Sequence, residues 1–205
     1  MKEEQDYLRD ITEIRTMMER SSKFMSLSGW AGIMAGVYAL AGAWIAYKVI
    51  QFNPVEIVGD SGVLPGSVSR VILLALSVLV LALSTAIYFS RRKASQREEK
   101  AWNATTKRLL MNMAVPLVAG GLLILVLISK GLIGLMVPSS LIFYGLALYN
   151  AGRYTYEEVS MLGIIQIGLG LLCSYFMEYG LLFWSLGFGV VHIVYGIYMH
   201  YKYER

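Results

Sequence analysis

The amino-acid sequence predicts an all-α, polytopic membrane protein with six transmembrane helices and an N-terminal cytoplasmic amphipathic helix. Three observations predict this fold class. Hydrophobic residues make up 57% of the 205 residues and charged residues only 16%, against about 25% charged in an average globular protein. Uncharged apolar segments of bilayer length recur along the chain. The positive charge between them lies almost entirely in alternate connections.

Residues 1–24 are predicted to form the cytoplasmic amphipathic helix. This segment mixes six acidic with five basic residues, which distinguishes it from a cleavable signal peptide. A spacing of four, three and four residues places one stripe along the helix, made of Tyr7, Ile11, Ile14 and Met18. A helix in the headgroup layer usually carries an excess of Lys and Arg, so the stripe predicts contact with protein. That protein is the chain's own cytoplasmic ends, a separate partner or a second copy.

Residues 25–205 are predicted to form the transmembrane domain. Six uncharged spans of 19 to 23 residues follow one another, at 25–47, 71–89, 109–129, 131–150, 159–177 and 179–201. About 20 helical residues cross a bilayer core. Continuous apolar runs lack the alternation of a barrel strand, so each span is expected to be a helix.

The distribution of positive charge predicts the orientation of these spans. Seven of the 18 Lys and Arg residues lie between the second and third spans, at Arg91, Arg92, Lys93, Arg97, Lys100, Lys107 and Arg108. With both termini cytoplasmic, fifteen positive residues lie inside and three outside, the three being Lys48, Arg70 and Lys130. The net charge of +4 is thereby explained by topology, and binding to nucleic acid is not expected.

Two polar side chains are predicted to form an intramembrane site. Gln166 lies near the middle of the fifth span and His192 near the middle of the sixth. Consecutive spans joined by a short turn pack antiparallel, so the two side chains are expected within hydrogen-bonding reach. Such a pair either holds two helices together or binds a proton or ligand.

Backbone features single out three further spans. Pro116 in the third span and Pro138 in the fourth are candidate helix kinks, because proline removes a backbone donor. In the first span, Ser28, Gly32 and Gly36 recur four residues apart. Small residues at this spacing let helix backbones approach closely, which predicts a centrally packed helix or a contact between copies.

Motifs for chemistry are not found, so no enzyme class is supported and no cofactor is expected. The single cysteine, Cys173, provides neither an internal disulfide nor a cysteine-based metal site. Glu56 and Asp60 lie in a Gly-rich outside loop, but their spacing matches no calcium-loop pattern. The sequence predicts a non-enzymatic membrane-embedded interaction or signalling module that acts through its cytoplasmic segments. The alternative is a small-solute or ion transporter or channel with a mid-membrane Gln/His site.

Two segments resemble a family of small uncharacterised bacterial membrane proteins with six helices. They are residues 182–196, LFWSLGFGVVHIVYG, and residues 18–24, MERSSKF, just before the first span. The resemblance implies a multi-pass protein of the bacterial inner (plasma) membrane and no mechanism. The expected partners are the lipid bilayer and a cytoplasmic protein or a second copy of the chain.

Overall fold

The computed structural model describes residues 27–52, 66–96 and 102–204. The predicted N-terminal helix with its stripe of Tyr7, Ile11, Ile14 and Met18 lies outside these residues, and so do Glu56 and Asp60. All secondary structure in the described ranges is helical. Six helical segments are long and apolar enough to cross a membrane.

The described helices match the predicted spans in order and differ from them mainly at their ends. The first five long helices are α2 Gly29–Lys48, α3 Gly66–Gln96, α4 Ala104–Ser129, α5 Met136–Gly152 and α6 Glu157–Tyr175. A 3₁₀ turn, η1 Ile133–Leu135, precedes α5. The last segment is composite, running through η2 Met177–Tyr179, α7 Gly180–Trp184, the π-helical η3 Ser185–Val191 and α8 His192–Tyr203.

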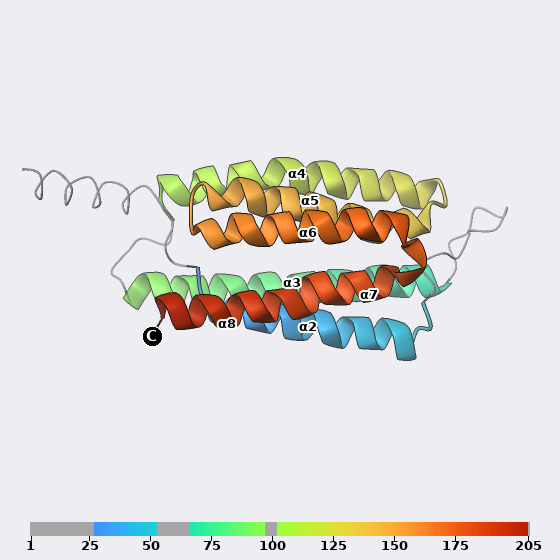
Figure 1. Cartoon of the computed structure of the whole chain (residues 1–205), viewed down its shortest axis with the longest axis horizontal. Coiled ribbons are helices and arrows are strands. Elements are labelled where there is room, and N and C mark those ends of the chain that lie inside the picture. Colours follow the sequence, from blue (N-terminus) through green and yellow to red (C-terminus); the bar gives the residue numbers. More distant parts are fainter. Residues whose placement is uncertain (1–26, 53–65, 97–101, 205) are drawn as a thin grey trace, which may run out of the picture.

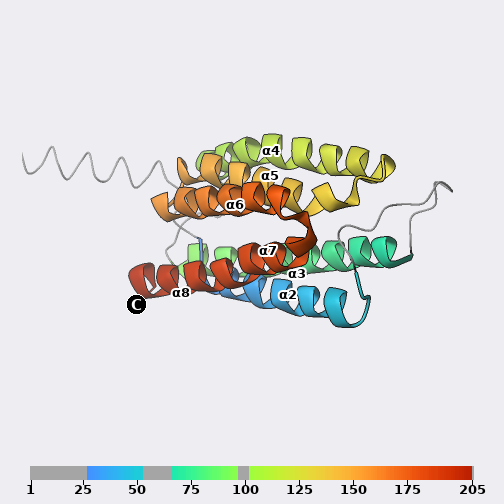
Figure 2. The same cartoon turned by 45° about the vertical axis from the view of Figure 1, so that its right-hand side comes forward.

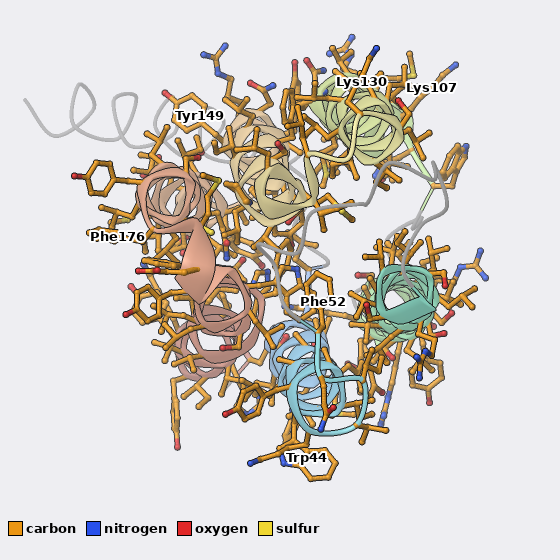
Figure 3. All side chains as sticks on the ribbon, turned by 90° about the vertical axis from the view of Figure 1, so that its right-hand side faces the viewer. Trp44, Phe52, Lys107, Lys130, Tyr149 and Phe176 are labelled. Carbon is orange, nitrogen blue, oxygen red and sulfur yellow. The ribbon has the colours of Figure 1, made fainter. Side chains whose placement is uncertain are left out.

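The helices form two layers whose axes run along the same direction (Figures 1 and 2). One layer holds α4, α5 and α6, and the other holds α3, α2 and α8. The end-on view shows α2 between α3 and the last segment of the chain (Figure 3). Within the layers the closest packing joins α5 to α6, α4 to α5, α2 to α8 and α2 to α3. The chain passes from one layer to the other through η2 and α7 (Figure 1).

The two ends of the bundle carry different numbers of positive residues. At one end, which we call the basic end, α2 begins, α3 ends, α4 begins and α8 ends (Figure 1). The Lys and Arg residues that the structure describes there are Arg91, Arg92, Lys93, Lys107, Arg108, Arg153 and Lys202. Lys48, Arg70 and Lys130 lie toward the opposite end. This division follows the charge pattern from which the orientation was predicted.

Glycines set the packing of α2 against α8, as the small residues of the first span predicted. A Cβ added to Gly29 would lie 2.4 Å from the carbonyl oxygen of Gly196, and one added to Gly196 would lie 2.6 Å from that of Gly29. Gly32 faces the backbone of α8 as well, and Gly36 faces the carbonyl oxygen of Gly189. The two backbones therefore touch along the contact, which only glycine allows.

The turn between α4 and α5 sets where α5 begins relative to Pro138. Gly131 adopts φ 71° and ends α4 in a Schellman motif, with N–H groups of Gly131 and Leu132 bonded to Ile128 and Leu127. Pro138 then lies in the first turn of α5, where a missing backbone N–H costs nothing. The kink at Pro138 stays a prediction. Pro116 does lie inside a helix, α4.

Helix α3 lies at the edge of its layer and packs chiefly against α2. Its middle is rich in aliphatic side chains that the other described residues leave uncovered, and more than half of the surface of each is exposed: Leu73, Leu76, Leu79, Val80, Leu81, Leu83 and Ile87. In a membrane these side chains would face lipid.

Candidate functional site

Gln166 and His192 lie together between the two layers, in what we call the mid-bundle cluster: Tyr144, Gln166, Gly187 and His192. Gln166 comes from α6 and is fully buried, while His192 begins α8 and is 5% exposed. The amide Nε2 of Gln166 lies 3.5 Å from His192 Nδ1. Both nitrogens bind the carbonyl oxygen of Gly187, at 2.7 Å for Gln166 and 2.8 Å for His192.

The partners of His192 determine which ring nitrogen carries the proton. A carbonyl oxygen only accepts hydrogen bonds, so Nδ1 must donate to Gly187. In the neutral imidazole Nε2 is then an acceptor, and the hydroxyl of Tyr144, 2.9 Å away, donates to it. The proton on Nδ1 faces an oxygen that cannot pass it on. In this arrangement the two hydrogen bonds hold the neutral His192 ring in one tautomer.

The π-helical segment η3 shapes the cluster. Gly187 lies in this segment, in which the backbone turns are wider than in an α-helix and the usual ladder of hydrogen bonds is interrupted. The Gly187 carbonyl accepts two side-chain hydrogen bonds there. A Cβ at this position would lie 2.6 Å from Gln166 Oε1, so glycine leaves room for the end of the Gln166 side chain. Single π turns within helices occur often at functional sites.

One polar atom of the cluster is left over. Gln166 Oε1 is buried and has no hydrogen-bond partner within the described ranges. An unsatisfied buried acceptor costs about 1–3 kcal/mol. Sequence analysis found Gln166 and His192 but missed Tyr144 and Gly187. The available signal for Tyr144 was its place inside a span, away from the ends where tyrosines usually gather.

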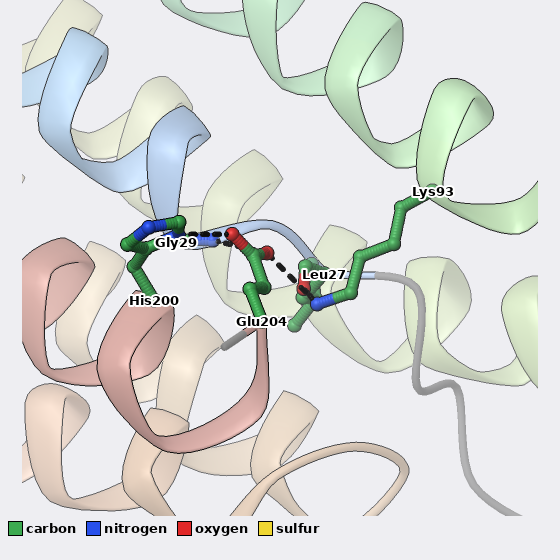
Figure 4. Close-up of polar contacts among 5 residues, drawn as sticks. All are labelled: Leu27, Gly29, Lys93, His200 and Glu204. Atoms are coloured by element: carbon green, nitrogen blue, oxygen red, sulfur yellow. Dashed lines mark hydrogen bonds and ion pairs between the residues drawn. The ribbon is translucent and has the colours of Figure 1, made fainter. Parts of the chain in front are cut away.

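A second polar group joins three chain segments at the basic end, and we call it the end junction: Leu27, Gly29, Lys93, His200 and Glu204 (Figure 4). The Glu204 carboxylate accepts from the backbone N–H of Gly29 at 3.0 Å and from Lys93 Nζ at 2.9 Å. It also accepts from His200 Nδ1 at 2.8 Å. Lys93 Nζ donates in addition to the carbonyl oxygen of Leu27.

The end junction is well shielded from water for a set of charged groups. The Lys93 side chain is 10% exposed and the Glu204 side chain 13%. Burial alone would raise the pKa of Glu204, but hydrogen bonds from His200, Lys93 and the Gly29 backbone outweigh it and lower this pKa to about 2. Glu204 is therefore ionised at neutral pH. Sequence analysis counted Lys93 only toward topology, and a pairing so distant along the chain left no local signal.

Neighbouring contacts connect α6 to the same end of α8. Lys202 Nζ donates to a carboxylate oxygen of Glu158, and the Tyr203 hydroxyl donates to the same oxygen at 2.9 Å. The rings of Tyr156 and Tyr203 lie 4.3 Å apart. The last turn of α8 therefore binds the start of α6 as well as the segments that the end junction joins.

The remaining candidates do not join either group. Neither Pro116 nor Pro138 forms a hydrogen bond with the mid-bundle cluster. Among the described residues, no three His, Cys, Asp or Glu side chains are grouped to hold a metal ion. Comparisons with protein-family models, curated proteins and solved structures give no match for this chain. The resemblance to small bacterial membrane proteins stays a prediction.

Proposed function

We propose that the protein is a non-enzymatic module of the bacterial inner membrane that interacts or signals through the chain segments at its basic end, on the cytoplasmic side. The end junction is the observation that supports this proposal most. Glu204, near the C-terminus, binds the first turn of α2 and the last turns of α3 together. The first described residue, Leu27, and the end of α3 at Gln96 both lie at this end.

This geometry connects the described residues to which the two charged segments, residues 1–26 and 97–101, are joined in sequence. Lys93 binds Leu27, the first described residue, and lies one turn before residues 97–101. A partner that bound residues 1–26 or residues 97–101 would therefore act next to the contacts of the Glu204 carboxylate. The strongly charged sequences of both segments suit a protein partner or a second copy of the chain.

The test disrupts the predicted stripe of the N-terminal segment without shortening the chain. We expect the double variant Ile11→Asp and Ile14→Asp to lose co-purifying partners or to change the oligomeric state, because charge removes an apolar contact. The measurement is native mass spectrometry of the detergent-solubilised protein, together with affinity purification. A matched control, Arg9→Gln with Glu13→Gln, changes the other faces of the predicted helix and conserves net charge. The proposal fails if the stripe variant and a deletion of residues 1–20 both behave like the native chain.

The transporter or channel remains a second candidate function, and Gln166 Oε1 favours it. A buried acceptor without a partner is what a passing cation or a donor group on a solute would bind. The hydrogen bond from His192 Nδ1 to the Gly187 carbonyl argues against transport of protons, because it holds the Nδ1 proton in place. We therefore expect no proton flux in proteoliposomes. Flux of protons, Na⁺, K⁺ or Cl⁻ that disappears in both Gln166→Ala and His192→Ala would establish the transporter instead.

A further inference from the structure

A pocket opens at the basic end between α2, α3 and α8. Its volume is about 480 Å³. Ser28 and Trp30 line it from the start of α2, His200, Tyr203 and Glu204 from the end of α8, and Phe89, Arg92, Lys93 and Gln96 from α3. The pocket therefore combines an aromatic wall with several hydrogen-bond donors.

The charge of the pocket is positive. Lys93 and Glu204 form an ion pair, and the Glu204 carboxylate is also bonded by Gly29 and His200. Its negative charge is thus matched within the protein. The Arg92 side chain is exposed, and within the part of the chain that the structure describes it pairs with no carboxylate. One guanidinium, suited to bidentate binding of phosphate, is left to face a ligand.

The surroundings of the pocket indicate which ligand carries the phosphate. Trp30 is 47% exposed and its ring lies edge-on to His200 at 5.5 Å; exposed Trp side chains near the ends of membrane helices are typical of headgroup level. Tyr88 and Leu81 precede Arg92 by four and eleven residues and so lie on the same face of α3; they are 61% and 51% exposed. An acyl chain lying along α3 would bring its own headgroup to Arg92.

We propose that this pocket binds the phosphate headgroup of an anionic phospholipid, with Arg92 as the main anion-binding residue and with Gln96 and Ser28 as further donors. Basic pockets between membrane helices on the cytoplasmic side bind anionic lipid headgroups in general. The proposal does not depend on the interaction or signalling function, because it concerns lipid at α3 and not the segments outside the described residues.

The test measures how much phosphatidylglycerol and phosphatidylcholine the full-length protein retains in native mass spectrometry from detergent. The native chain is expected to retain phosphatidylglycerol selectively. Arg92→Gln should weaken this binding roughly tenfold, because one charge-assisted hydrogen-bonding group is lost. Arg91→Gln is the matched control: Arg91 is the neighbouring exposed basic residue, it does not line the pocket, and its change should leave retention within about twofold of the native value.

Three results would overturn the assignment. Equal retention of phosphatidylcholine would remove the headgroup specificity. Equal losses in Arg91→Gln and Arg92→Gln would mean that diffuse charge, and not the pocket, attracts the lipid. Displacement of phosphatidylglycerol by inorganic phosphate at equal concentration would mean that the site binds free phosphate. Thermal unfolding of both variants, expected to match the native chain because both side chains are exposed, confirms that folded proteins are compared.

Discussion

Replacing Glu204 by glutamine is expected to lower the free energy of unfolding by about 2 kcal/mol at neutral pH, the range for hydrogen bonds to a charged group. The neutral amide cannot balance the charge of Lys93, whose side chain is only 10% exposed. It also weakens the bond from the Gly29 backbone. The measurement is denaturant unfolding in detergent micelles, followed by circular dichroism and tryptophan fluorescence.

The pH dependence of stability identifies the carboxylate as the cause. The pKa of Glu204 is about 2 in the folded protein against an ordinary value of 4.5, so the ionised form stabilises the fold. This contribution is complete above pH 4.5 and is lost as the pH falls toward 2. Glu204→Gln should lack that component. Glu178→Gln, an exposed carboxylate at the opposite end, should change stability by less than about 0.5 kcal/mol. Equal pH profiles for Glu204→Gln and the native chain would contradict the role of Glu204.

Adding one methyl group at Gly196 is expected to cost about 1–3 kcal/mol. A Cβ there would lie 2.6 Å from both the carbonyl oxygen of Gly29 and the amide nitrogen of Ile33. Both atoms belong to the backbone of α2, which cannot turn aside as a flexible side chain would. The helices α2 and α8 would have to separate. The measurement is the unfolding midpoint of Gly196→Ala in micelles.

The matched control is Gly168→Ala on α6. A Cβ at Gly168 meets nothing within 4 Å, and alanine is the better helix former by about 0.5–1 kcal/mol. This variant should be neutral or slightly stabilised. If both alanine variants lost the same stability, the cost would come from glycine replacement in general and not from the contact between α2 and α8.

The lengths of the apolar runs predicted much of the fold, because the length of such a run can be read directly from the local sequence. Each of the six predicted spans corresponds to a described apolar segment, since a bilayer-length run without charge leaves helix as the only way to satisfy its backbone. The ends of the helices were harder to predict from the sequence. Gly66–Gln96 extends well beyond span 71–89, because residues outside the apolar core still continue a helix. Pro138 illustrates the same point: the sequence shows a proline in an apolar run but not that it lies in the first turn of α5.

The candidate sites were predictable only where neighbouring spans decide the contact. Gln166 and His192 lie on consecutive segments, so their proximity followed from antiparallel packing. Tyr144 comes from α5, and its bond to His192 depends on how the two layers meet. The Gly187 carbonyl is a backbone group in a π-helical segment. Residue types alone do not predict where such a segment forms. Lys93 and Glu204 are 111 positions apart, and charge counting alone cannot pair them.

The glycine contact between α2 and α8 has a consequence for biosynthesis. The ribosome makes α2 first among the described helices, whereas α8, on which its glycine face packs, is the last of them. Throughout translation that face lacks its native neighbour, and small residues give it little apolar surface with which to attract another. A chain truncated before α8 is therefore expected to keep this face of α2 unpaired and to be degraded by quality-control proteases.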